Sequence, residues 1–482
     1  MRSSKTQPRQ RSHTRRWRGS RKKQRFDSIN ISTMKAGAMY FNEFQCRKKR
    51  SLLRLVLFIC ASIFLCLSNF AVASTISFRP HIGVERAMQH GDLQALSKLK
   101  DKYPYAKMAA LLVQYRMKTL QEYSYVCFTS KKVRAKIPVL PIVCSKFFIS
   151  AALHRDDLSN MAEMILHGRN YLKGYERRMG YPQADFRFYS YPGVRNLLQI
   201  HPPEVIFNNK STVTLDWTED CRGRPLKSSS VSIDINGVMS CFYIDTGSRN
   251  SSITSLLARW LQLKMVTGVG DTSVLPSHAL GIAIAKQISL GGVVVKNHVF
   301  RVFSGSDGVR GMNILGIDFL SHFGYVEFNQ KGILIARHGT PPCNNAMRFS
   351  FYKFLGVGPV FPITVNGHIV NALFDSGQTF HLALTSSDLL KKKSELVPQL
   401  PIINGIEGEH KNVYSTNAAI GLGNLVTLVR AEYAPGLKND MPIRAVFGFP
   451  FLSDMNVVLD FRDHKACLVK DVNSKAEITF LH

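Results

Sequence analysis

The chain contains one stretch twice, and this duplication constrains its fold more than any other feature. Ser232–Gly247 reads SIDINGVMSCFYIDTG, Pro362–Gly377 reads PITVNGHIVNALFDSG, and the two align without a gap. In each copy an alternating stretch leads to an Asn-Gly pair, which supplies the positive φ angles of a two-residue hairpin, and a second apolar stretch follows. Each copy ends in Asp-Thr-Gly or Asp-Ser-Gly, whose glycine lets the backbone turn sharply beside a carboxylate. The sequence therefore predicts two equivalent hairpins, each followed by an acidic loop.

The duplication continues downstream of the hairpins. Ile314–Ser321 aligns with Val446–Ser453, and the glycine in each follows the aspartate of its own copy by 71 and 73 residues. Between aspartate and glycine each copy holds a short glycine-bearing segment, at Val266–Gly270 and Ile402–Gly408. Repeated units typically stack so that each covers the apolar face of the other. A repeat of this length has the size of a whole lobe.

These motifs, in this order, resemble those of the retropepsin-like aspartic peptidases. The signature of that family is an apolar strand, D-[ST]-G, a glycine-rich flap and a later apolar-apolar-Gly. The resemblance covers roughly residues 229–469. It implies a mostly β fold with two retropepsin-like β-barrel lobes related by a pseudo-two-fold axis, which an α-helical N-terminal domain precedes.

The resemblance also implies roles for individual residues. Asp245 and Asp375 are the expected catalytic pair. The residues expected to brace the two loops against each other are Thr246, Gly247, Ser376 and Gly377. The residues expected to bind substrate from the flaps are Gly268, Val269, Gly270, Gly405, Ile406 and Gly408. Gln378 departs from the family, which usually keeps a small residue there, as Ser248 is in the first copy, so the pocket on that side is expected to differ.

The chemistry follows from two carboxyl groups that face each other. They cannot both ionise at low cost, so the pair shares a proton. The ionised carboxylate takes a proton from a bound water, and the protonated one donates to the carbonyl oxygen of the substrate. The sequence therefore predicts an exported aspartic endopeptidase that acts on peptides or proteins without metal or cofactor. Two alternatives stay open: an inactive peptide-binding module that uses the same cleft, and a scaffold whose function lies in the helical domain.

The basic composition does not by itself indicate binding to nucleic acid, and a signal-peptide pattern near the N-terminus predicts export. The net charge is +30, but residues 1–73 hold 17 Lys and Arg against two acids, and no nucleic-acid motif accompanies them. The basic Arg47–Arg50, the apolar Leu55–Leu67 and the Ala71–Ala73 site together indicate a signal peptide cleaved before Ser74. We therefore expect a periplasmic or secreted protein. An uncleaved segment that associates with the membrane is the less favoured alternative.

The rest of the chain has a helical part and a part rich in strands. Val84–Leu99, Ala106–Tyr123 and Leu158–Tyr175 carry apolar residues at helical spacing, whereas Ile137–Ile149 contains Pro138 and Pro141 and is expected to be a loop before a short buried segment. The helical domain is a candidate docking surface for a protein partner. The predicted organisation is a basic extension with signal peptide at 1–73, a helical domain at 80–185, an irregular linker at 186–228, a first lobe at 229–338, a linker at 339–349 and a second lobe at 350–475.

Six cysteines remain after the predicted signal: Cys127, Cys144, Cys221, Cys241, Cys343 and Cys467. An even number in an exported chain permits disulfides, but six cysteines allow 15 pairings, and the sequence does not choose among them. Cys241 lies inside a predicted strand and is equally compatible with a free buried thiol. The chain has no C-x-x-C and no His-x-x-x-His pair, so no structural metal is expected.

Overall fold

The computed structural model describes residues 81–179, 193–208, 212–219, 221, 228–266, 280–304, 313–339, 344–352, 355–390, 397–404, 409–422, 425–433, 443–453 and 455–469. The chain divides into two units, Met1–Val72 and Ala73–His482, and all described residues belong to the second. The predicted signal peptide and the six predicted flap residues lie outside the described residues. Within these ranges, no helix is both long enough and apolar enough to span a bilayer.

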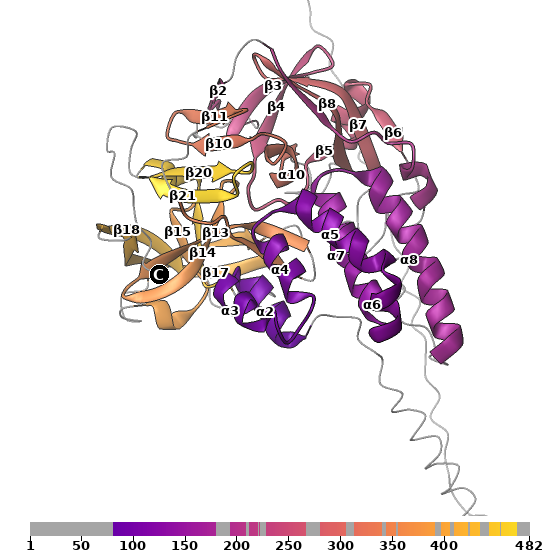
Figure 1. Ribbon diagram of the computed structural model, residues 1–482. Coiled ribbons are helices and arrows are strands. Elements are labelled where there is room, and N and C mark those ends of the chain that lie inside the picture. Colours follow the sequence, from indigo (N-terminus) through magenta and orange to yellow (C-terminus); the bar gives the residue numbers. More distant parts are fainter. Residues whose placement is uncertain are drawn as a thin grey trace, which may run out of the picture. The chain divides into compact units, whose positions relative to one another are not determined.

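Helices form the first part of the described chain. They are α2 (Ile82–His90), α3 (Leu93–Leu99), α4 (Ala106–Val113), α5 (Met117–Thr129), α6 (Lys131–Lys136), α7 (Leu140–His154) and α8 (Leu158–Met179). These helices, shown in indigo to magenta in Figure 1, lie inside the range predicted to be helical. We call residues 81–179 the helical region.

The interpretation of Ile137–Ile149 as a loop is wrong. Residues from Leu140 onward form α7, and Pro141 lies at its first turn, where a missing N–H leaves no hydrogen bond unmade. All residues of α7 are buried, because its sequence is apolar on every side and other elements surround it. A disulfide between Cys127 and Cys144 joins α7 to α5.

Strands form most of the rest of the described chain, with short helices such as α9 (Ser255–Trp260) between them. The first eight-stranded sheet contains β1 (Glu204–Phe207), β3 (Ser230–Ile235), β4 (Val238–Ile244), β5 (Ser252–Thr254), β6 (Lys264–Val266), β7 (Gly281–Ser289), β8 (Val293–Phe303) and β9 (Ile314–Leu315). The second contains β12 (Phe349–Tyr352), β13 (Leu355–Val365), β14 (His368–Asp375), β15 (Leu382–Leu384), β16 (Val397–Asn404), β17 (Glu409–Leu422), β18 (Leu425–Tyr433) and β19 (Ala445–Gly448). We call these sheets, with their connections, the first and second lobes. The predicted mostly β fold with a preceding helical region is confirmed.

The two lobes have the same strand order. The first reads β3-β4-β9-β5-β8-β7-β6 and the second reads β13-β14-β19-β15-β18-β17-β16. In both lobes the order closes on itself, through a pairing of β3 with β7 and of β13 with β17. Two parallel pairs occupy the same places in both lobes: β4 with β9 matches β14 with β19, and β5 with β8 matches β15 with β18. The duplication seen in the sequence is therefore a duplication of topology.

The Asn-Gly turns have the conformation that the sequence predicts. Asn236 and Asn366 have φ angles of 53° and 49°, and Gly237 and Gly367 have φ angles of 88° and 85°. Positive φ at both central residues is the hairpin geometry whose twist matches that of the flanking strands. The strands β3 and β4, and likewise β13 and β14, pair directly across these turns.

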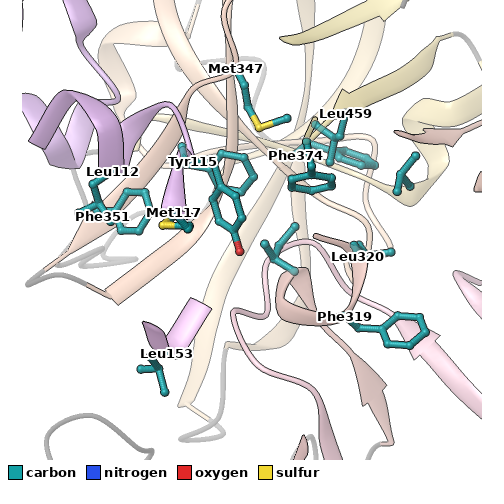
Figure 2. Packing of buried hydrophobic residues seen from close by; sticks show 14 of the residues in the cluster. Leu112, Tyr115, Met117, Leu153, Phe319, Leu320, Met347, Phe351, Phe374 and Leu459 are labelled. Carbon is teal, nitrogen blue, oxygen red and sulfur yellow. The ribbon is translucent and has the colours of Figure 1, made fainter. Parts of the chain in front are cut away.

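A third sheet contains one strand that precedes the first hairpin and two strands that follow each lobe in sequence. Its order is β2 (Thr212–Asp216), β11 (Gly332–Ala336), β10 (Tyr325–Phe328), β20 (Asn456–Asp460) and β21 (Lys465–Val469). The pairing of β10 with β20 joins chain segments that follow the two halves of the duplication. One hydrophobic cluster includes buried residues of all these parts, and Figure 2 shows Tyr115 of the helical region, Phe319 of the first lobe and Phe374 of the second within it.

The helical region also makes direct hydrogen bonds to the second lobe. The hydroxyl of Ser350 donates to the carbonyl of Gln89 at 2.7 Å, and the amide of Asn371 donates to the carbonyl of His90 at 2.6 Å. Both acceptors are carbonyls of the last turn of α2, which the helix itself leaves without partners. The second lobe therefore caps the end of this helix.

Candidate active site

Each acidic loop begins where the second hairpin strand leaves its sheet. The backbone N–H of Asp245 donates to the carbonyl of Leu315 on β9 at 3.0 Å, and Asp375 lies opposite Gly448 in the β14–β19 pairing. A Cβ atom on Gly316 would lie 2.7 Å from the carbonyl oxygen of Ser248, closer than side chains pack. This close approach explains why a glycine follows the apolar pair in each copy.

The two loops hold each other through their hydroxyl residues. The N–H of Thr246 donates to Oγ of Ser376 at 3.0 Å, and the N–H of Ser376 donates to Oγ1 of Thr246 at 2.9 Å. Each hydroxyl then donates across the gap, from Thr246 to the carbonyl of Phe374 and from Ser376 to the carbonyl of Ile244, both at 2.8 Å. Thr246 is 0% and Ser376 1% exposed, so these four bonds are shielded from water. The interaction is reciprocal and needs one hydroxyl from each loop.

The crossing of the loops brings the two aspartates together. A Cβ atom on Gly377 would lie 2.7 Å from Cγ of Asp245, and one on Gly247 would meet the carboxyl group of Asp375. Each carboxyl group therefore lies over the glycine of the opposite loop, and the charge of Asp375 acts directly on Asp245. Both aspartates keep partial solvent exposure, so water can reach the pair.

The surroundings raise the pKa of both carboxyl groups. Burial raises the pKa of Asp245 most, the negative charge of Asp375 and their hydrogen bond raise it further, and the N–H groups of Ser248 and Gly247 oppose the rise only in part. Burial also raises the pKa of Asp375, but hydrogen bonds from Gln378, Asp245 and nearby backbone N–H groups counteract it. The two carboxyls cannot both ionise at low cost, so the pair shares one proton. The amide of Gln378, which donates to Asp375, favours Asp375 as the ionised member.

Gln378 has a role that the sequence did not indicate. Its Nε2 donates to Oδ2 of Asp375 at 3.1 Å. The equivalent Ser248 directs its hydroxyl to the carbonyl of Asn250 at 2.9 Å and offers Asp245 only its backbone N–H, at 2.9 Å. The sequence marked Gln378 as unusual in type, but only the side-chain direction shows that it contacts a carboxylate. This contact makes the two halves of the site chemically unequal.

Asp318 is a second residue that sequence reasoning missed. It is fully buried, and its carboxylate accepts from the N–H of Ser251 at 2.9 and 2.7 Å and from the Ser251 hydroxyl at 2.8 Å. The Ser251 hydroxyl in turn accepts from the N–H of Gly316 at 3.1 Å. The network therefore ties the segment after the first acidic loop to the glycine motif of β9. The only signal in the sequence is that Asp318 aligns with Pro450, which has no carboxylate.

Comparison with known proteins finds a family match for part of the chain. Residues 231–319 match the family model described as aspartyl protease. The chain is similar to the retropepsin-like aspartic peptidases. The predicted resemblance is confirmed. No curated protein matches the chain in sequence.

Two solved structures are similar to parts of the chain. A retropepsin-like aspartic protease from Rickettsia conorii is 17% identical, with 28% of this chain and 91% of that chain covered and a TM-score of 0.19. An aspartic proteinase from Irpex lacteus is 12% identical, with 54% of this chain and 98% of that chain covered and a TM-score of 0.36.

The predicted flaps are bounded by paired strands. Asn404 pairs with Glu409 at the end of the β16–β17 hairpin, so Gly405, Ile406 and Gly408 fall in its connection. In the first lobe Val266 pairs with Ile282, on either side of the segment that holds Gly268, Val269 and Gly270. The flap residues themselves lie outside the described residues, and their role stays a prediction.

Proposed function

We propose that this protein is an aspartic endopeptidase that uses Asp245 and Asp375 as one acid–base pair. The observation that carries the proposal is that each carboxyl group lies against the glycine of the opposite loop, with the loops braced against each other through Thr246 and Ser376. Two carboxyls that share one proton provide an acid and a base in one site. The family match and the fold support hydrolysis of peptides.

In the proposed mechanism the ionised Asp375 takes a proton from a water bound between the carboxyl groups. The resulting oxygen attacks the peptide carbonyl, and Asp245 donates its proton to the carbonyl oxygen, which gives a tetrahedral diol. The proton on Asp375 then passes to the leaving nitrogen while Asp245 recovers a proton from the diol, so the C–N bond breaks and both aspartates return to their starting states. General acid–base transfer of this kind contributes about 10²–10⁴-fold.

A peptide-binding module without hydrolysis is the second candidate. The observation that favours it is the amide of Gln378, which occupies an oxygen of the carboxylate that would act as base. In this alternative the water site is blocked, and the cleft holds peptides intact. The two candidates share a fold and differ in whether a bound peptide is cut.

Cleavage of a peptide mixture by the purified protein distinguishes the two candidates. The endopeptidase should produce new peptide termini, and Asp375→Asn should abolish them. Asp216→Asn is the matched control, because Asp216 is an exposed aspartate at the end of β2. Cleavage by Asp375→Asn equal to that by Asp216→Asn excludes the proposed pair. Peptide binding without cleavage by the unmutated chain supports the binding module instead.

Export to the periplasm or outside the cell is a separate part of the proposal. It rests on the basic and apolar segments before Ser74 and on the disulfides, which persist in oxidising compartments. Cys127 pairs with Cys144 and Cys221 pairs with Cys241, so Cys241 is not a free thiol. N-terminal sequencing of the protein from the host should begin at Ser74. A chain that retains the apolar segment supports a membrane anchor instead.

A further inference from the structure

A group of buried polar side chains lies away from the acidic loops, where the helical region meets the first lobe. Asp156 lies in the turn between α7 and α8, His298 lies on β8, and His322 follows α10 (Ile317–Leu320). Their side chains are 0%, 0% and 10% exposed. Three elements that are far apart in the sequence thus bring one carboxylate and two imidazoles to a single point.

The distances within this group fit one metal ion. Oδ2 of Asp156 lies 3.4 Å from Nδ1 of His298 and 3.6 Å from Nε2 of His322, and the three ligand atoms all lie within 4.8 Å of one another. Tetrahedral zinc with ligands about 2.0–2.1 Å away separates neighbouring ligand atoms by about 3.3 Å. The two shorter separations are close to this value, so binding requires only a small inward movement of the imidazoles.

Oδ2 of Asp156 lies at ion-pair distance from both imidazoles, but the polar atoms of the group have no hydrogen-bond partners among the described residues. They are both carboxylate oxygens of Asp156, both ring nitrogens of His298 and Nε2 of His322. An unpaired buried polar atom costs about 1–3 kcal/mol, and an unpaired buried charge costs more. Nearly every buried polar group in a folded protein has a partner. A bound cation satisfies the carboxylate and one nitrogen of each imidazole at once.

The chemistry of the donor atoms narrows the choice of cation. Two imidazoles and a carboxylate suit zinc and neighbouring divalent ions, whereas calcium and magnesium take oxygen ligands. Phe300 and Phe319 contact the His298 ring edge-on, and such apolar surroundings favour the neutral imidazole that binds metals. The three side chains supply three of the four ligands that zinc takes in a tetrahedral site.

We propose that Asp156, His298 and His322 bind a divalent cation of the zinc class that fixes the helical region to the first lobe. The site is structural, because its ligands are buried and belong to two different parts of the fold. It takes no part in the proposed hydrolysis. The site could not be predicted from the sequence, because residues 156, 298 and 322 form no local motif.

A buried arginine offers the competing explanation. Arg301 lies on β8, is 2% exposed, and its three guanidinium nitrogens have no hydrogen-bond partners among the described residues. If Arg301 pairs with Asp156 in solution, the charge of the carboxylate is neutralised without a metal. Metal content measured on the folded protein decides between the two.

The experiment measures metal bound to the full chain. The protein is purified, unfolded with a chelator, refolded with or without zinc, and passed through a desalting column before elemental analysis. We expect about one zinc per chain and a higher melting temperature than for the metal-free protein. Asp156→Asn and His322→Asn should each retain less than a tenth of this zinc. His154→Asn is the matched control, because His154 is an equally buried histidine of α7 outside the group, and it should retain the zinc.

Cobalt binding to the unmutated chain is a second test, which needs no variant and so stays decisive if a variant does not fold. A tetrahedral site should give the unmutated chain an intense visible absorption that is lost on addition of excess zinc. The proposal is overturned if the refolded chain holds no zinc, if Asp156→Asn binds as much as the unmutated chain, or if cobalt gives only the weak spectrum of an exposed ion. None of these outcomes depends on peptide cleavage, so the test is independent of the proposed enzyme activity.

Discussion

Replacing Gln378 by methionine should move the acid side of the pH–activity profile to higher pH. Methionine keeps the length of the side chain but removes the amide that donates to Asp375 at 3.1 Å. That hydrogen bond stabilises the ionised carboxylate and lowers its pKa. Activity requires Asp375 to be ionised, so it falls as the pH drops through the pKa of this carboxyl. Without the amide that pKa is higher, and the fall in activity begins at higher pH.

The size of this shift follows from the energy of the lost bond. A hydrogen bond to a charged group contributes about 1.5–3 kcal/mol, and one pKa unit corresponds to about 1.36 kcal/mol. Because Asp375 keeps partial solvent exposure, water replaces part of the lost interaction. We therefore expect the acid limb of kcat/KM to move by about one pH unit, at the lower end of that range.

The assay is the pH dependence of kcat/KM for one peptide substrate. Ser248→Ala is the matched control, since the Ser248 hydroxyl donates to the Asn250 carbonyl and not to Asp245. Its acid limb should coincide with that of the unmutated protein. The reasoning is refuted if Gln378→Met leaves the acid limb in place, or if Ser248→Ala moves it equally.

Three further predictions concern stability. Thr246→Val should lower the free energy of unfolding by about 2–4 kcal/mol in urea titrations, because it leaves the buried N–H of Ser376 and carbonyl of Phe374 unpaired; a loss below 1 kcal/mol would contradict this. Burial raises the pKa of Asp318 to about 7. Between about pH 4 and 7 the folded state therefore binds more protons than the unfolded state, so the free energy of unfolding should fall as the pH rises through this window. Asp318→Asn should reduce that slope, and an unchanged slope would refute the assignment. Cys241→Ser should cost about 2–4 kcal/mol by breaking the bond to Cys221, and an equal melting temperature would argue against the disulfide.

Much of the fold could be predicted because the duplication can be recognised from short sequence motifs. Asn236 and Asn366 specify hairpins by their backbone preferences alone, and the aspartates follow each hairpin at a fixed offset. Identical local patterns form identical local structures, so the same strand order in both lobes follows from the repeat. Asp245 and Asp375 are far apart in the sequence, but their proximity in space could be predicted because two matched lobes bring matched loops together.

The features that the sequence did not reveal depend on side-chain direction and on long-range packing. The Gln378 side chain contacts Asp375, but the residue type alone permits several directions. Asp156 meets His298 only because the helical region packs on the first lobe, and no local pattern encodes that contact. Pro141 suggested a loop because its position in the first turn of α7 was not recognised, although proline is tolerated there.

A double-mutant cycle on the two aspartates tests the central claim most directly. Asp245→Asn, Asp375→Asn and the double variant are compared with the unmutated protein by kcat/KM for one peptide. If the carboxyls share one proton and act as a unit, each single variant should lose at least about 10²–10⁴-fold. The double variant should then be hardly worse than either single one, because residues that act as a unit are strongly non-additive. Losses that multiply in the double variant, or a single variant that retains full activity, would contradict the paired mechanism.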